Sequence, residues 1–179
     1  IFDTIKSVFR TYGFAPLETP AMENLSTLLG KYGDEGDKLL FKILNSGDYA
    51  ANLSDEQIRT ASQICEKGLR YDLTVPFARF TAEHYSELYL PFKRYHIAKV
   101  WRGEKPQAGR YREFVQCDVD TVGSDTAAAD FEILNVMKSA LSAIGVDDIT
   151  INVNHRGIFN RFLSKLDLSQ FADPFRIED

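Results

Sequence analysis

Hydrophobic and polar residues alternate in the middle of the chain, within residues 93–123. β-Branched and aromatic residues fill both ends of this stretch, while Gly103, Pro106 and Gly109 punctuate its centre. Successive side chains of a strand point to opposite faces. The stretch therefore predicts two antiparallel strands joined by a basic loop.

The second of these strands is predicted to have one polar and one apolar face. The polar face carries an aromatic ring, an amide and two carboxylates: Phe114, Gln116, Asp118 and Asp120. We expect the opposite face to point into the core, with Cys117 as a buried, reduced thiol between Val115 and Val119.

The first strand runs into a cationic loop. Arg102 ends it, and the loop carries Glu104, Lys105, Arg110 and Arg112. Arginine forks bind phosphate oxygens, and an aromatic face stacks on a planar base. The pattern therefore suits a ligand with phosphates at one end and a base at the other. The alternative is an ordinary hairpin with a solvated charged loop.

Periodicity predicts helices and extended segments in the rest of the chain. Helices are expected at about residues 1–12, 21–29, 75–85, 125–144 and 156–166. Extended segments are expected at residues 14–20, 38–44, 69–74 and 149–153, with a surface excursion over 45–64. These elements are interleaved around an antiparallel pair, so the predicted class is α+β, with a mixed, mainly antiparallel sheet flanked by helices.

Helix ends and the long helix give more local predictions. Gly13 and Gly145 are expected to end the first and the long helix. Ser124 or Asp125 is expected to cap the long helix at its start. The apolar stripe of that helix is expected in the core: Phe131, Leu134, Val136, Met137, Leu141 and Ile144.

A carboxylate and a hydroxyl lie where residues 69–74 lead into a helix. Asp72 and Thr74 would lie on one side of an extended chain, and such groups receive an ammonium group by charge-assisted hydrogen bonds. The alternatives are that Thr74 is only the N-cap of the helix and that Asp72 is a surface turn charge.

Length, net charge and the absence of long apolar runs exclude some classes of protein. The chain has 179 residues, 44% of them hydrophobic, so it is able to bury a core and is most simply one domain or a large part of one. A net charge of -5 argues against a protein that coats nucleic acid. No apolar run is long enough to span a bilayer, and no signal-peptide pattern is present, so we expect a cytoplasmic protein without membrane contact.

The cysteines and histidines do not form a metal-binding pattern. Cys65 and Cys117 lie far apart, and the spacing of His84, His96 and His155 matches no ligand set. We therefore expect no protein-bound metal site.

The hairpin resembles a known sequence motif. Arg102-Gly103-Glu104, then Pro106-Gln107 and the run from Gly109 to Phe114, resemble motif 2 of the class II aminoacyl-tRNA synthetases and look most like the histidyl-tRNA synthetase version. The resemblance implies that Arg102 is catalytic and binds the α-phosphate of ATP and the substrate carboxylate. It implies that Glu104 meets the adenine side, Arg110 binds the γ-phosphate and Phe114 stacks on adenine.

The same resemblance implies an amino-acid site. Gln116 would hold the backbone groups of histidine, and Asp120 would face its ammonium or imidazole group. Arg70 to Thr74 look like the loop of this family that binds the α-amino group, which implies that role for Asp72 and Thr74 and a backbone contact for Leu73.

Residues of about 8–30 are similar to motif 1 of the same class, which implies a homodimer through this segment. The alternative is an amphipathic helix packed on its own sheet. The chain has no motif 3, no histidine signature with a catalytic arginine and no anticodon-binding domain. We therefore expect residues 1–179 to be a partial catalytic domain that begins inside a longer protein and is inactive alone.

The implied activity is histidine-tRNA ligation. ATP, with Mg²⁺ bound largely through its own oxygens, would activate histidine as histidyl-adenylate for transfer to tRNA(His). Two alternatives stay open: a non-catalytic histidine-binding regulatory subunit of ATP phosphoribosyltransferase, and a class II synthetase for another amino acid.

Overall fold

The structure, a computed structural model, describes residues 1–165. Ile1–Val146 form one compact unit, and a second unit begins at Asp147. The helices are α1 (Phe2–Thr11), α2 (Leu25–Leu28), α3 (Gly33–Lys38), α4 (Asp55–Ile58), α5 (Ala61–Ile64), α6 (Thr74–His84), the 3-10 helix η1 (Tyr85–Glu87), α7 (Ala127–Ala143) and, in the second unit, α8 (Arg156–Lys165). The strands are β1 (Ala15–Pro16), β2 (Met22–Asn24), β3 (Lys42–Ile43), β4 (Lys67–Leu69), β5 (Phe92–Trp101) and β6 (Glu113–Val122).

The predicted hairpin is confirmed. β5 and β6 pair antiparallel along their whole length, and β1 adds a short parallel edge to β5. Cross-strand partners share a face of the sheet. The register therefore puts one row of β5 on the polar face predicted for β6, through the pairs Arg94 with Asp120, His96 with Asp118, Ala98 with Gln116 and Val100 with Phe114.

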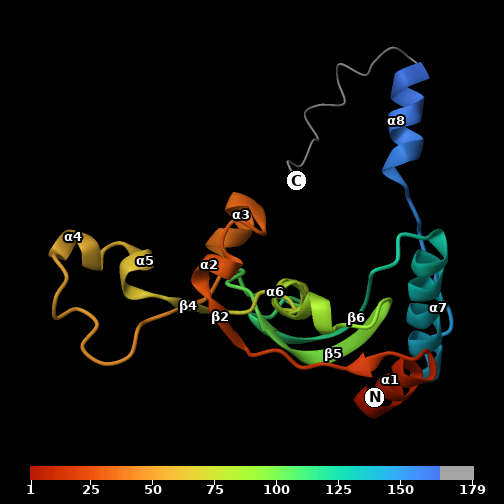
Figure 1. The fold of residues 1–179 in the computed structure, drawn as a ribbon, viewed down its shortest axis with the longest axis horizontal. Coiled ribbons are helices and arrows are strands. Elements are labelled where there is room, and N and C mark those ends of the chain that lie inside the picture. The colour runs from red at the N-terminus through yellow and green to blue at the C-terminus, as the bar shows by residue number, and fades with distance from the viewer. Residues whose placement is uncertain (166–179) are drawn as a thin grey trace. The chain divides into compact units, whose positions relative to one another are not determined.

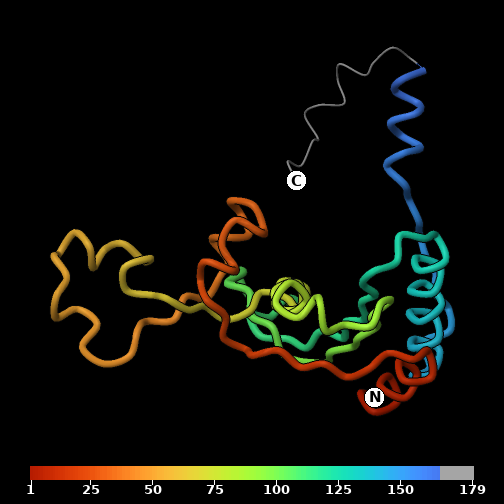
Figure 2. Tube along the Cα trace, viewed as in Figure 1, coloured from red at the N-terminus to blue at the C-terminus, as the bar shows by residue number. Residues whose placement is uncertain are grey.

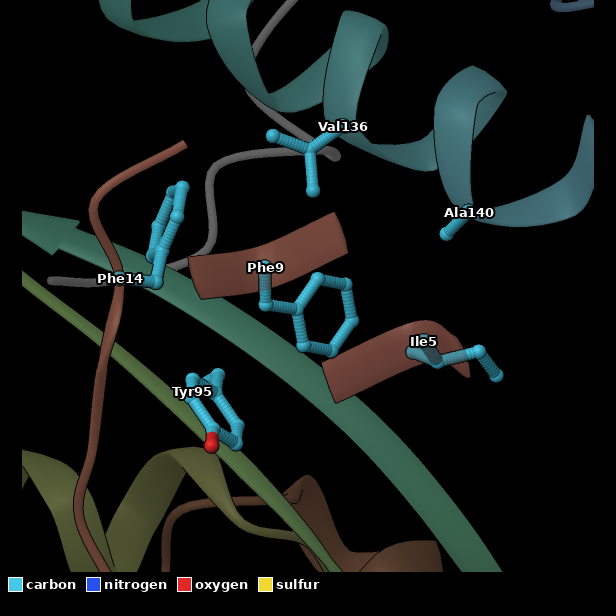
Figure 3. Packing of buried hydrophobic residues seen from close by; sticks show 6 residues of the cluster. All are labelled: Ile5, Phe9, Phe14, Tyr95, Val136 and Ala140. Carbon is cyan, nitrogen blue, oxygen red and sulfur yellow. The ribbon is translucent and has the colours of Figure 1, made fainter. Parts of the chain in front are cut away.

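Helices cover both faces of this hairpin (Figure 1). α6 lies over the polar face, where the Phe77 ring packs on the guanidinium of Arg94. α1 and α7 pack together over the opposite face. There they form a core with Phe14 and the strand residue Tyr95, shown in Figure 3 with its cluster Ile5, Phe9, Phe14, Tyr95, Val136 and Ala140. The core thus supports the apolar face of the hairpin, while the polar face is turned toward α6.

A second small sheet has the strand order β2-β4-β3, with both pairs antiparallel. Between β3 and β4 the chain makes the predicted excursion, which carries the short helices α4 and α5 and extends away from the two strands (Figure 2). Trp101 donates its backbone N–H to the carbonyl of Arg70, just beyond β4, so the segment that follows β4 reaches the end of β5.

Four predicted elements were wrong in part. Of residues 69–74, only Leu69 lies in a strand, because β4 spans Lys67–Leu69 and α6 begins at Thr74. Residues 21–29 begin as strand β2, because Met22–Asn24 pair with β4, and only Leu25–Leu28 are helical. Residues 38–44 are not one strand, since α3 runs to Lys38 and only Lys42–Ile43 pair with β4. Residues 149–153 are irregular, and within the described residues no strand pairs with them.

The two predicted glycine ends are confirmed. Gly13 and Gly145 follow α1 and α7 with φ of 80° and 87°, a conformation that favours glycine. The start of α7 is later than predicted, because Thr126 rather than Ser124 or Asp125 is its N-cap residue. The last helix was predicted correctly, except that Leu166 lies outside the described residues.

Two burial predictions were too broad. In the stripe of α7, Val136 is buried, but Phe131 is 67% and Met137 46% exposed, because α1 covers only part of that helix face. Cys117 is exposed rather than buried, because the apolar pocket that it lines with residues of α1 and α7 is open to solvent. Among residues 1–165, no helix has both the length and the apolar content needed to cross a bilayer.

Candidate functional site

One pocket lies at the loop end of the hairpin. It has a volume of about 320 Å³ and is lined by Arg102, Glu104, Gly109, Arg110, Tyr111 and Phe114. The structure therefore brings together, around one open cavity, the four side chains predicted to bind ATP. All four come from one hairpin: Arg102, Glu104 and Arg110 from the loop between β5 and β6, and Phe114 from the start of β6.

Arg102 is held between two aromatic rings. Its guanidinium carbon lies 4.4 Å from the ring centroid of Tyr71 and 5.0 Å from that of Phe114. Its Nε donates to the carbonyl oxygen of Tyr71 at 3.2 Å. Its backbone N–H donates to the carbonyl of Arg112, across the mouth of the loop. The arginine is thus positioned by packing and by the backbone, which suits a group that meets a phosphate oxygen.

The loop contains an internal ion pair. Arg110 donates to the Glu104 carboxylate at 3.2 Å, and Arg112 donates to the Glu104 carbonyl at 3.0 Å. The Arg110 side chain is largely exposed, so the pair contributes little stability by itself. A phosphate arriving at Arg110 would compete only with this weak contact.

A second pocket, of about 380 Å³, lies between α6 and β6. Both Thr74 and Asp120 line it, together with residues of the two elements: Phe77, Ala78, Thr81, Ala82, Thr121 and Val122. This pocket joins two residues, one from each element, that were predicted to bind the amino acid. Gln116 lies on the same face of β6 but lines neither pocket; its amide donates to Asp118 at 3.4 Å.

Asp72 has a local role that was not predicted. Its Oδ1 accepts the backbone N–H groups of Thr74 at 3.2 Å and Val75 at 3.1 Å, so Asp72, not Thr74, supplies the side-chain cap of α6. The cap residue itself is Leu73, in a helical conformation. The Tyr32 hydroxyl also donates to Asp72 at 3.1 Å, and burial followed by the Asp72 charge raises the pKa of Tyr32.

Leu73 contributes a backbone group to another protein residue. Its side chain is fully buried, and its carbonyl oxygen accepts a hydrogen bond from Arg94 at 2.9 Å. Arg94 also forms an ion pair with Asp120, with 2.7 Å between Nη2 and Oδ2.

The sequence reasoning missed Arg94 and gave Asp118 no role. Strand alternation placed Asp118 on the polar face, and the same alternation along the first strand was the available signal for Arg94, which pairs with Asp120. Burial raises the pKa of Asp118 to about 6, and the neighbouring Asp120 charge adds to the rise. Burial likewise raises the pKa of Asp120, while the Arg94 charge opposes that rise.

His96 lies next to these groups and is neutral at physiological pH. It is 4% exposed, and burial first, then the charges of Arg70 and Arg94, lower its pKa to about 4. A neutral imidazole adds no positive charge to that of the nearby arginines. No chemistry was predicted for His96, and the structure gives it a packing position.

Comparison with known proteins identifies the family. The family model described as histidyl-tRNA synthetase matches residues 1–173. The chain belongs to the histidyl-tRNA synthetase family. Histidine-tRNA ligase of Treponema denticola is 53% identical over 180 positions, which cover all of this chain and 37% of that protein. The chain thus spans little more than a third of the length of this curated relative.

Solved structures of the family share the fold. Histidyl-tRNA synthetase from Nostoc sp. PCC 7120 superposes with a TM-score of 0.71 at 29% identity, over 95% of this chain and 34% of that one. A Bacillus halodurans protein described as an ATP phosphoribosyltransferase regulatory subunit/histidyl-tRNA synthetase gives 0.72 at 26% identity, over 92% and 38%. The predicted family and the predicted α+β synthetase-like fold are confirmed.

Proposed function

We propose that this chain is the part of a histidine-tRNA ligase that binds ATP and histidine. A carboxylate oxygen of histidine attacks the α-phosphorus of ATP, the bond to the β-phosphate oxygen breaks, and pyrophosphate leaves. The resulting histidyl-adenylate then passes its acyl group to the 3′ end of tRNA(His), releasing AMP. The observation that carries the proposal is the single cavity shared by Arg102, Glu104, Arg110 and Phe114 in a chain of this family.

The roles on the ATP side follow from chemistry and position. Arg102 stabilises the charge that develops on the α-phosphate, because a preorganised guanidinium acts best where charge appears in the transition state. Arg110 binds the γ-phosphate by exchanging its contact with Glu104, which then meets the adenine amino group. Phe114 provides the flat face for the base. Mg²⁺ enters with ATP, bound largely through phosphate oxygens.

On the histidine side, the proposed ligands come from the second pocket, from the segment before α6 and from β6, which runs from the first pocket to the second. Asp72 and Thr74 receive the α-amino group, and Leu73 contributes only backbone. Gln116 binds the backbone groups of the amino acid, and Asp120 binds the ammonium or imidazole group. The raised pKa of Asp118 and Asp120 supports this assignment, because a buried carboxylate of high pKa is stabilised when a cation arrives.

The same proposal covers the assembly. Residues 93–123 act as motif 2, and residues of about 8–30 act as motif 1, through which two copies form a homodimer. The exposed Met22, the first residue of the edge strand β2, supports a contact surface there. The chain is then a partial catalytic domain of a cytoplasmic enzyme, and tRNA(His) meets parts of the protein beyond it as well.

A regulatory subunit of ATP phosphoribosyltransferase is the second candidate, favoured by the description of the Bacillus halodurans structure. A regulator that only senses histidine has no need for the Arg102, Arg110 and Phe114 cavity. The higher identity, 53% against 26%, also supports the ligase.

Histidine-dependent exchange of pyrophosphate into ATP separates these functions. We expect the full-length protein that carries this chain to catalyse exchange with histidine and not with the other amino acids. Histidine binding without exchange would support the regulatory subunit, and exchange with a different amino acid would support another class II synthetase.

A further inference from the structure

A buried arginine lies behind the two walls of the α6 and β6 pocket. Arg94 of β5 is 1% exposed, and its guanidinium carbon lies 4.2 Å from the ring centroid of Phe77. Its Nη2 donates to the carbonyl oxygen of Leu73 at 2.9 Å and lies 2.7 Å from Oδ2 of Asp120. One nitrogen atom therefore connects the segment that precedes α6 with β6.

The surroundings leave this arginine little freedom. Asp120 is its direct cross-strand partner, so the ion pair is built into the β5 and β6 register. Leu73 is fully buried and immediately precedes Thr74, which lines the pocket. The Phe77 ring fixes the guanidinium plane from the side of α6. A shift of any one of these groups would move the others.

Arg94 is the positive charge on which several nearby carboxylates act. The carboxylates of Asp120, Asp118 and Asp72 all act on its charge. Only Arg94 and Arg102 are cations that act on Asp118 in turn. Negative charge thus exceeds positive charge on this face among the described residues, and the charge of Arg94 opposes the rise in the pKa of Asp120, which lines the pocket.

We infer that Arg94 is a positioning residue for the amino-acid substrate: it holds the Asp120 carboxylate and the Leu73 carbonyl at a fixed separation, so that both pocket walls fit one histidine. This inference rests on the proposed function. Arg94 acts through Asp120 and the start of α6, not by contact with the substrate. A merely structural buried pair would support the fold without affecting substrate binding.

The chain offers a matched structural pair as a control. Arg79 of α6 binds the Glu23 carboxylate through two nitrogens, each at 2.9 Å, and the Glu23 side chain is buried. Neither residue lines the ATP-side or the amino-acid pocket. Arg79→Met therefore removes a comparable arginine and carboxylate pair away from the site.

The experiment compares Arg94→Met, Arg94→Lys and Arg79→Met in the full-length protein, by pyrophosphate exchange and thermal melting. We expect Arg94→Met to raise the KM for histidine by about tenfold or more, with the KM for ATP within about twofold of wild type. Arg94→Lys should give an intermediate histidine KM, because an ammonium keeps the charge but not the planar fork. Arg79→Met should lower the Tm and leave both KM values unchanged.

A lower Tm with an unchanged histidine KM in Arg94→Met would overturn the inference and leave only a structural role. If Arg94→Met does not fold, Arg94→Lys decides, and a wild-type histidine KM in that variant overturns the inference as well. Failure of the proposed function is recognised separately, because the wild-type protein itself would then show no histidine-dependent exchange; that result removes both claims.

Discussion

His96 and Asp118 are direct cross-strand partners in the β5 and β6 ladder, yet they do not form an ion pair. The imidazole loses its proton at a lower pH than the carboxyl group does. The pKa of the imidazole is lowered to about 4, and the pKa of the carboxyl is raised to about 6. Between these values both groups are neutral. The pair therefore gives the polar face a pH response with two opposing parts.

The sign of each part follows from proton linkage. Folding raises the pKa of Asp118, so its stabilising contribution is full below pH 4 and is lost as the pH rises through about 6. Folding lowers the pKa of His96 below 6.5, so its contribution to stability is lost as the pH falls from 6.5 toward 4. Acidification thus strengthens one residue's contribution while it weakens the other's.

Asp118→Asn should expose the His96 effect. The amide keeps an acceptor for Gln116 and removes the buried charge, so the variant should be more stable than wild type at pH 7.5, by about 1–3 kcal/mol. This advantage should shrink toward pH 4.5. Urea unfolding at both pH values measures it, and an equal difference at the two pH values would contradict the assigned pKa of Asp118.

Asp72 has two separable roles, as cap of α6 and as proposed ligand of the α-amino group. Asp72→Asn keeps an oxygen for the N–H groups of Thr74 and Val75 but removes the charge. We expect the free energy of unfolding to change by less than about 0.5 kcal/mol and the histidine KM to rise about tenfold or more. Asp72→Ala should also lose stability, by about 1 kcal/mol.

Equal histidine KM values for the Asp72→Asn variant and wild type would assign Asp72 to capping alone. Urea midpoints of the Asn and Ala variants supply the stability comparison, and pyrophosphate exchange at varied histidine concentration supplies the KM.

Phe114 is expected to act on ATP and not on histidine. Stacking of a base on an aromatic ring is worth about 1–3 kcal/mol, so Phe114→Ala should raise the KM for ATP by about 5- to 100-fold. Phe114→Tyr should stay near wild type because the ring is kept. Val115→Ala, at the next residue on the opposite face, is the control. A Phe114→Ala variant with the ATP KM of the Val115→Ala variant would remove the stacking role.

The sequence predicted what depends on local periodicity and missed what depends on distant partners. Alternation along residues 93–123 was enough to predict the polar face of β6, because one pleat repeats every two residues. The contact of Arg94 with Leu73 joins positions 21 residues apart and leaves no local pattern.

Two further predictions differ from the structure, each for its own reason. Thr74 was a reasonable cap candidate, but Leu73 adopts a helical conformation, which moves the cap contact to the side chain of Asp72. Phe131 fits the apolar stripe of α7, but periodicity gives the direction of a stripe and not how much of it a neighbour covers.

Arg102→Ala tests the central claim, that the hairpin binds ATP beside histidine. Lys99→Ala is its control, because Lys99 is a largely exposed cation of β5, three residues before Arg102, and is paired with Glu113. In the full-length protein, we predict that Arg102→Ala lowers the rate of histidine-dependent pyrophosphate exchange by about 100-fold or more, and that Lys99→Ala leaves it near wild type. An undiminished exchange rate in Arg102→Ala would contradict the account.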